Sequence, residues 1–160
     1  MKKILFYRPS EPYGELSNFS PHPFELDGQR WPTVEHYFQA QKFPGTDHAE
    51  RIRQAKSPMI AKRLGRSHAV PLRRDWEAVK EQVMLTALRT KFTQHADLRE
   101  LLLRTRNDEL IEHTENDRYW GDGGNGRGKN RLGYLLMQLR TELQQAFAAT
   151  QPPFTNSPTH

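Results

Sequence analysis

The spacing of apolar residues predicts a mainly helical chain. Residues 76–92 form the longest segment in which apolar side chains recur with the period of a helix. Near the end of the chain, residues 132–143 place leucines on one stripe at the same period. Three shorter segments, residues 33–43, 59–64 and 96–105, also have helical character. The polar positions between the apolar ones indicate helices that bury one face and expose the other.

Residues that commonly begin helices precede three of the helical segments. Ser57 and Pro58 stand at the start of one of them, and proline favours the first turn of a helix. Asp75 is placed to cap the longest helix. Asp47 and Glu50 have the spacing of a capping box ahead of another short helix. These signals divide the middle of the chain into separate helices.

Strand signals are few. Residues 3–7 read as a strand, and residues 24–31 read as a hairpin because Asp27 and Gly28 can take the positive φ angles of a two-residue turn. Residues 109–114 are too short to classify by period, and we interpret them as a candidate strand. We therefore predict a mainly α (α+β) protein, a compact helical domain with a small antiparallel β component.

The length and composition of the chain indicate one domain. A chain of 160 residues suits a single core, which we place in residues 1–148. Residues 149–160 are rich in proline, and we expect them to form a disordered tail. The chain has no cysteine, which excludes disulfides and thiolate metal sites. It has neither a signal-peptide pattern nor an apolar run near the ~20 residues of a membrane span, so we expect a cytoplasmic protein with no membrane partner.

The charge pattern favours an anionic ligand. The formal net charge is +5, but the cations along residues 51–74 are spread out, with apolar residues between them. A nucleic-acid surface and a small phosphate-bearing molecule are both compatible with a basic protein. Because the cations do not form one block, we favour the small anionic ligand.

A glycine-rich stretch, YWGDGGNGRGKNRLGYLL at residues 119–136, matches two expressions for nucleotide-binding loops. The pattern G-x-G-x-x-G requires a preceding strand in a parallel βαβ unit, and the residues before this loop are polar. The pattern G-x-x-x-x-G-K requires Ser or Thr after Lys129, where this chain has Asn130. A flexible connector is the structural alternative. Because Trp120 and Asp122 crowd the loop's entry, we instead expect its backbone to approach an anionic ligand.

Candidate catalytic residues lie in the segment WPTVEHYFQAQKF. Glu35 and Lys42 share one helix face and are candidates for an acid–base or nucleophile pair, although a solvated helix face is the simpler explanation. Aromatic neighbours such as Trp31 change this balance, because desolvation would raise the pKa of Glu35 as general acid–base catalysis requires. The histidines have no metal-binding spacing, and no serine lies in a G-x-S-x-G elbow.

Three further residues have both a structural and a functional interpretation. Asn18 and Phe19 lie in a turn-rich loop, where they offer an amide and a stacking face but also suit a turn and a core aromatic. Trp76 begins the longest helix and suits core packing as well as ligand contact. The residues alone leave these alternatives open.

Several long motifs resemble the YbiA-like, or NADAR, family. They are YGELSNF, WPTVEHYFQAQKF, SPMIAKRLGR, PLRRDWEAVKEQVM, LRTKF and HTENDRYWGDGGNGRGKNRLGYLLMQLR. The resemblance runs from about residue 6 to about residue 143. It implies a compact, mainly helical N-glycosidase with no metal or other cofactor. Some family members cleave ribose 5-phosphate from the amino-pyrimidine of early riboflavin intermediates, and others remove ADP-ribose from modified guanine in nucleic acid.

The resemblance also implies site residues at the matching positions. Glu35 is the expected catalytic carboxylate, Asp122 is expected to assist it, and Lys42 is a candidate nucleophile that would form a Schiff base with the sugar. The expected substrate-binding residues are Asn18, Phe19, Trp76, Trp120, Gly123, Lys129 and Asn130. Val34 departs from the small polar residue that the family pattern leads us to expect before the glutamate, which concerns the local packing of Glu35.

These residues suggest how the glycosidic bond would break. A carboxylate would stabilise the positive charge that develops on the ribose, and the two tryptophans would stack on the base or the sugar. The glycine loop and Lys129 would hold the phosphate. Three interpretations stay open: an enzyme on free riboflavin intermediates, an enzyme on ADP-ribosylated guanine, and a non-catalytic module that binds ADP-ribose.

Overall fold

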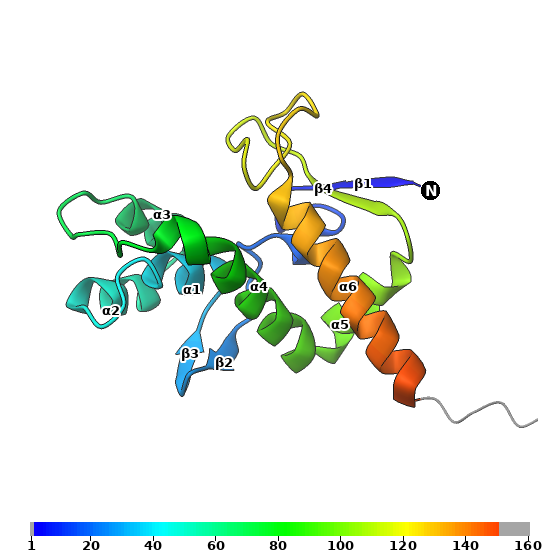
Figure 1. The fold of residues 1–160 in the computed structure, drawn as a ribbon, viewed down its shortest axis with the longest axis horizontal. Coiled ribbons are helices and arrows are strands. Elements are labelled where there is room, and N and C mark those ends of the chain that lie inside the picture. The colour runs from blue at the N-terminus through cyan, green and yellow to red at the C-terminus, as the bar shows by residue number, and fades with distance from the viewer. Residues whose placement is uncertain (1, 151–160) are drawn as a thin grey trace, which may run out of the picture.

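Helices dominate the fold, as the apolar periodicity predicts (Figure 1). The computed structural model describes residues 2–150. Its helices are α1 (Val34–Ala40), α2 (Asp47–Arg53), α3 (Pro58–Gly65), α4 (Trp76–Gln94), α5 (Ala96–Arg104) and α6 (Arg131–Thr150), with a 3-10 turn at Gly14–Leu16. Its strands are β1 (Lys3–Phe6), β2 (Phe24–Leu26), β3 (Gln29–Trp31) and β4 (Glu109–Glu112).

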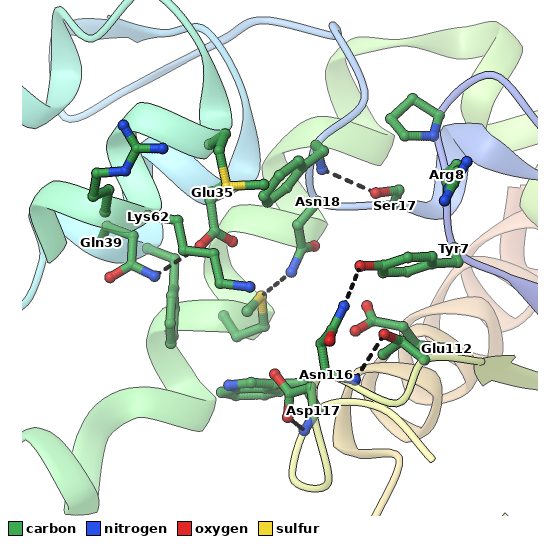
Figure 2. A pocket seen from close by; sticks show the side chains of 18 of the residues that line it. Tyr7, Arg8, Ser17, Asn18, Glu35, Gln39, Lys62, Glu112, Asn116 and Asp117 are labelled. Atoms are coloured by element: carbon green, nitrogen blue, oxygen red, sulfur yellow. Dashed lines mark hydrogen bonds between the residues drawn. The ribbon is translucent and has the colours of Figure 1, made fainter. Parts of the chain in front are cut away.

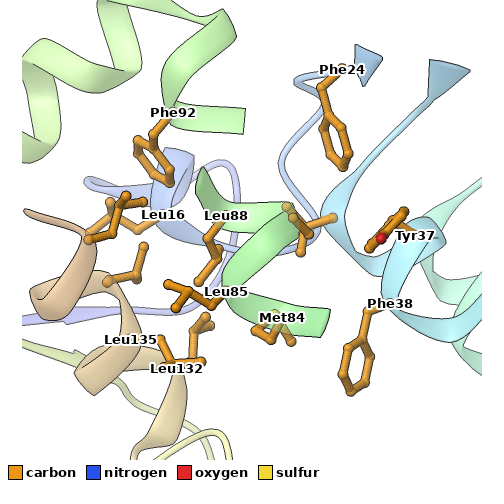
Figure 3. Packing of buried hydrophobic residues seen from close by; sticks show 14 of the residues in the cluster. Leu16, Phe24, Tyr37, Phe38, Met84, Leu85, Leu88, Phe92, Leu132 and Leu135 are labelled. Atoms are coloured by element: carbon orange, nitrogen blue, oxygen red, sulfur yellow. The ribbon is translucent and has the colours of Figure 1, made fainter. Parts of the chain in front are cut away.

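The hydrophobic core lies where α4 meets α1 on one side and α6 on the other (Figure 3). The predicted period of α4 is confirmed by Ala87, Leu88 and Phe92, which are fully buried, and the leucine stripe of α6 packs against them. Each such Leu or Phe contributes about 1.5–3 kcal/mol by leaving water. This core fixes α1 and α4 relative to each other, and both helices supply residues to the cavity described below.

The strands form two separate pairs. The predicted hairpin is confirmed, since β2 and β3 pair antiparallel and both Asp27 and Gly28 have positive φ angles of 55° and 75°. The candidate strand in residues 109–114 is confirmed as β4, but it pairs in parallel with β1, with Phe6 opposite Glu112. The β component is therefore antiparallel in one pair and parallel in the other.

The helix starts agree with the sequence in one case and differ in two. Ser57 caps α3, because its side chain accepts a hydrogen bond from the Ile60 N–H. The predicted cap of α2 was wrong by one residue, since Thr46 accepts the Ala49 N–H and Asp47 lies inside the helix. Asp75 occupies the cap position of α4 without a capping bond, because its carboxylate binds the Arg73 guanidinium instead.

The last helix passes the predicted domain boundary. Because α6 continues to Thr150, residues 149 and 150 belong to it rather than to the predicted tail. Residues 151–160 lie outside the described residues, and the disordered tail stays a prediction. No helix in residues 2–150 is long and apolar enough to cross a membrane.

Candidate active site

A cavity of about 980 Å³ lies between α1, α3 and the ends of β1 and β4 (Figure 2). Its walls come from segments far apart in the sequence. They are the chain between β1 and β2, helices α1 and α3 with the residues just after them, one residue of α4, and the end of β4 with the chain that follows it. Of the expected site residues, the cavity is lined by Asn18, Phe19, Glu35, Lys42 and Trp120. The fold thus brings half of the expected site residues together around one cavity.

Glu35 is a buried carboxylate in this cavity, with 7% of its surface exposed. It lies in the first turn of α1, which Thr33 caps, and its backbone N–H donates to the Asn18 carbonyl at 3.2 Å. Its Oε1 accepts a hydrogen bond of 2.7 Å from Gln39 Nε2. Burial raises the pKa of Glu35, and the Gln39 hydrogen bond and the charges of Lys62 and Lys42 partly offset this rise. Glu35 is therefore a buried acid with a raised pKa, and Gln39 and the two lysines favour its ionised form against the effect of burial.

Two buried oxygens beside Glu35 have no hydrogen-bond partner among the described residues. They are Oδ1 of Asn18 and Oε1 of Gln39, and both residues line the cavity. The Asn18 amide nitrogen has only the Met84 sulfur, at 3.5 Å. A buried polar atom without a partner costs about 1–3 kcal/mol, which makes Asn18 Oδ1 a candidate acceptor for a donor group of a ligand. Gln39 Oε1 instead lies against Gly65, where a Cβ would come within 1.9 Å of it.

Because α1 ends at Ala40, Lys42 lies outside the helix whose face it was predicted to share with Glu35; it still lines the cavity, with its amine among aromatic rings. Its Nζ lies 5.9 Å from the centre of the Phe38 ring and 5.8 Å from the centre of the Trp76 ring. The same nitrogen donates to the Gly65 carbonyl at 3.4 Å. Burial lowers the pKa of Lys42, although the charge of Glu35 opposes this shift. The neutral amine is therefore more accessible than in an exposed lysine.

Trp120 and Trp76 differ in their position relative to the cavity. Trp120 lines the cavity, and its ring meets Phe38 edge-on at 5.4 Å between centres. Its backbone N–H donates to Asp117 Oδ1 at 2.8 Å, which fixes the indole at the cavity wall. Trp76 is 5% exposed and does not line the cavity; it packs behind Phe38. Contact with a ligand in this cavity is thus open to Trp120, while Trp76 supports the wall.

The glycine loop supports the site from behind. Gly123, Lys129, Asp122 and Asn130 do not line the cavity. Asp122 accepts hydrogen bonds from the Thr114 N–H at 3.1 Å, the Gly124 N–H at 2.8 Å and His113 Nδ1 at 2.7 Å. Burial alone would raise the pKa of Asp122, but these hydrogen bonds outweigh it and lower the pKa. Asp122 is therefore an anion that ties the loop to the end of β4.

Asn130 completes the edge of β4. Its side chain accepts the Glu112 N–H at 3.0 Å and donates to the Leu110 carbonyl at 2.9 Å, as a neighbouring strand would. Its own φ of 48° is left-handed, a conformation that asparagine tolerates better than most residues. Next to it, Gly133 leaves room for this contact, since a Cβ there would lie 2.1 Å from the Leu110 carbonyl oxygen.

The cavity also contains residues that the sequence did not single out. Its cations are Arg8, after β1, and Lys62, Arg63 and Arg66, on or just after α3. Helical spacing could have placed the α3 cations on one side, but only the tertiary structure places them opposite Arg8.

Glu112 is a further lining residue that the sequence did not single out. It lies on the inward face of β4, the same face as the fully buried Leu110, and lines the cavity. Burial and the charges of Asp117 and Glu35 raise the pKa of Glu112 to about 8. The signal in the sequence was an acidic residue at an inward position of a short apolar strand.

Among residues 2–150, no group of three or more His, Asp or Glu side chains is arranged to hold a metal ion. Because carboxyls and cations line one cavity, its own side chains can support acid–base catalysis.

Known proteins are similar over the same residues that form the cavity. The NADAR domain matches residues 5–144. An N-glycosidase YbiA of Shigella flexneri is 62% identical over 140 residues, which cover 88% of this chain and 88% of that protein. A riboflavin biosynthesis protein of Vibrio vulnificus is 43% identical over 142 residues, which cover 89% of this chain and 39% of that protein. The NMR structure of the E. coli protein YbiA matches with a TM-score of 0.87 and 56% identity, over 96% of this chain and 92% of that chain.

Proposed function

This chain belongs to the NADAR family and is an N-glycosidase; from that premise we propose its substrate and the side chains that act on it. The substrate is a small molecule in which ribose 5-phosphate is joined through nitrogen to an amino-pyrimidine, as in riboflavin-related intermediates. The similarity to a riboflavin biosynthesis protein supports this choice. The reaction adds water across the bond between the ribose C1′ and the nitrogen.

Glu35 is the carboxylate that steadies the ribose as the bond breaks. Positive charge develops at C1′ and the ring oxygen when the base leaves, and an anion close to C1′ lowers the energy of that state. The observation that carries this assignment is that Glu35 is buried in the cavity and accepts a hydrogen bond from Gln39, which favours its ionised form. The same carboxylate accepts a proton from the attacking water.

The unpartnered oxygen of Asn18 positions the sugar. It is an acceptor on a residue that lines the cavity beside Glu35, and ribose hydroxyls are donors of the right kind. Trp120 supplies a face on which the base can stack. Together these contacts would place C1′ against the Glu35 carboxylate.

The phosphate binds to the cations of α3. Lys62, Arg63 and Arg66 line one wall of the cavity, whereas Lys129 of the glycine loop does not. Arginine and lysine form charge-assisted hydrogen bonds to phosphate oxygens, which are about twice as strong as neutral ones. We therefore assign the phosphate to this wall and assign Asp122, Gly123 and Asn130 to holding the end of β4 in place.

Lys42 offers a covalent route as the second candidate mechanism. Its buried amine has a lowered pKa and lies within the electrostatic reach of Glu35. Attack on C1′ by this amine would break the bond to the pyrimidine nitrogen, which takes a proton and leaves, and opening of the ribose ring would then give a Schiff base that borohydride reduces to a stable adduct. Mass spectrometry of the protein after borohydride treatment during turnover distinguishes this route from direct attack by water.

The size of the cavity favours one second substrate. At about 980 Å³, it is at the upper end of the range for ligand sites, about 300–1,000 Å³, and has room for more than one ribose phosphate. ADP-ribose joined to guanine is therefore the alternative substrate, with Arg8 placed apart from the α3 cations to meet a second phosphate.

Glu35→Gln tests the proposed function directly. The purified protein is incubated with a 5-phosphoribosylamino-pyrimidine and, separately, with an oligonucleotide that carries ADP-ribosylated guanine, and the products are identified by mass. We expect ribose 5-phosphate from the first substrate and a fall in kcat of about 100-fold or more in Glu35→Gln, because the variant loses the anion at C1′.

The matched control is Glu77→Gln, which removes a carboxylate on the exposed surface of α4 that does not line the cavity. It should keep the wild-type kcat. Wild-type activity in Glu35→Gln would remove Glu35 as the catalyst, and cleavage of neither substrate by the wild type would remove the proposed substrates.

A further inference from the structure

A second carboxyl, Glu112, is partly buried, faces the same cavity as Glu35 and has no part in the steps above. Figure 2 shows Glu112 beside Tyr7 and Asn116, across the cavity from Glu35. Among residues 2–150, no hydrogen bond or salt bridge engages its side chain, although its neighbours Asn116 and Tyr7 bind each other at 3.1 Å. An acidic group without a partner at the cavity wall is free to act on a ligand.

The backbone of Glu112 is held firmly on both sides. Its N–H donates to Asn130 Oδ1 at 3.0 Å, and its carbonyl accepts the Asp122 N–H at 2.9 Å. Gly121 is needed for this approach, since a Cβ there would lie 2.9 Å from the Glu112 carbonyl oxygen. The glycine loop thus positions the Glu112 side chain, which explains why it surrounds the site without lining the cavity.

The two carboxyls differ in the charges of their neighbours, which are mainly cations at Glu35 and mainly acids at Glu112. Glu35 receives the Gln39 hydrogen bond and has two lysines, Lys62 and Lys42, near it. Glu112 is surrounded mainly by acids: Asp117 and Asp122 from the loop after β4, and Glu35 across the cavity. Lys62 is the cation that acts on it. When two acids share a site and only one is supported as an anion, the proton resides on the other.

We propose that Glu112 is the general acid of the reaction, donating its proton to the nitrogen that leaves C1′. The proposal rests on the proposed N-glycosidase function. The bond between C1′ and nitrogen breaks, its electron pair goes to the nitrogen, and this nitrogen takes the Glu112 proton. Water adds to C1′ and gives its proton to Glu35. One proton then passes from Glu35 to solvent and one returns to Glu112, so the net reaction consumes one water.

The pH dependence follows from these two protonation states. The active enzyme has Glu112 protonated and Glu35 ionised. Burial and the nearby acids raise the pKa of Glu112 to about 8, so activity declines as the pH rises through that value. The charged and titratable groups that face Glu112 are Asp117 and Asp122 from its own loop, Glu35 from α1, Lys62 from α3, and Tyr7 and Arg8 from the chain after β1.

Two substitutions of Glu112 test its role in turnover. Glu112→Gln keeps the shape of the protonated acid but cannot give up a proton, so kcat on the 5-phosphoribosylamino-pyrimidine should fall about 100-fold or more. The alkaline decline of kcat/KM should also disappear. Glu112→Ala leaves space for a small acid, so added formate should restore part of its activity.

The matched control is Glu109→Gln, which makes the same change three residues earlier on β4 and on the opposite face of the strand. It should keep the wild-type kcat and pH profile. Wild-type kcat in Glu112→Gln, or an alkaline decline that persists in it, would overturn the proposal. That outcome differs from failure of the proposed function, in which the wild type itself would not cleave the substrate.

A measurement of stability checks the protonation state without any substrate. A carboxyl whose folded pKa is raised favours folding below its unfolded pKa and loses that advantage as the pH rises through the folded value. Wild-type Tm should therefore fall relative to the Tm of Glu112→Gln between about pH 5 and about pH 8. A Tm difference that is constant over this range would show that Glu112 is already ionised, and the proposal would fail.

Discussion

Gln39 favours the ionised form of Glu35, and Gly65 leaves the space that Gln39 occupies. The Gln39 amide gives Glu35 its hydrogen bond of 2.7 Å. A Cβ at Gly65 would lie 1.9 Å from Gln39 Oε1 and 2.9 Å from its Cβ, so no side chain fits at position 65 while Gln39 stays where it is. A glycine at the end of α3 is thereby required by the chemistry of α1.

Gly65→Ala should displace Gln39 from the Glu35 carboxylate. Because this hydrogen bond lowers the pKa of Glu35 against the effect of burial, its loss should raise that pKa further and move the acidic limb of the kcat/KM profile to higher pH. At neutral pH we expect kcat/KM to fall about tenfold, the equivalent of a lost hydrogen bond to a charged group.

Gln39→Ala serves as the comparison for Gly65→Ala, because it removes the same hydrogen bond directly. The two pH profiles should shift in the same direction. An unchanged acidic limb in both variants would show that Gln39 does not govern the ionisation of Glu35.

Elements of the fold are held to one another by buried polar groups as well as by the core. Lys91 of α4 is 1% exposed, and its Nζ donates to the Glu15 carbonyl at 2.6 Å and to the Ser17 carbonyl at 3.1 Å. These carbonyls belong to the turn that precedes Asn18. A single lysine thus attaches the Asn18 loop to the longest helix.

Lys91→Met should destabilise the protein by about 1–3 kcal/mol, because two buried carbonyls lose their donor. Burial lowers the pKa of Lys91 to about 7, below its value in the unfolded chain. The contribution of Lys91 to stability therefore grows as the pH rises from about 7 to about 9, and so should the deficit of the variant.

Chemical unfolding at both pH values measures this deficit. Lys3→Met, at an exposed position of β1, is the control and should change stability little. A variant as stable as the wild type at both pH values would show that Lys91 does not hold the loop.

For the whole molecule, the cavity joins parts of the chain that lie far apart in the sequence. One wall comes from α1 and α3, and the opposite wall comes from β1, β4 and the loop beyond them. A ligand that contacts both walls must stabilise the folded state, because it binds only when the walls are together. At a concentration of about 100 times Kd, that stabilisation is about 2.7 kcal/mol.

Ribose 5-phosphate should therefore raise the Tm of the wild type by several degrees. Lys62→Ala should weaken this binding about tenfold or more, since it removes a charge-assisted contact to the phosphate. Lys56→Ala is the matched control, because Lys56 is exposed and does not line the cavity. Equal Tm shifts in the two variants would contradict the placement of the phosphate at α3.

Local patterns in the sequence determined much of this protein. Helices with strong apolar periods, such as residues 76–92, and a hairpin with a two-residue turn follow from interactions between near neighbours, which a short window of sequence contains. The family motifs determined the N-glycosidase assignment. The placement of Glu35 beside aromatic residues could also be predicted from the sequence, because helix spacing puts them on adjacent turns.

Only the tertiary structure decided which side chains share the cavity. The parallel pairing of β1 with β4 joins residues about a hundred positions apart, and it alone places Glu112 and Arg8 in the same cavity as Glu35. It also gives the glycine loop a supporting place behind β4, although its sequence suggested direct contact with a phosphate. The reason is physical: the energy of a buried charge depends on the atoms that fold around it, and these come from parts of the chain that no local pattern connects.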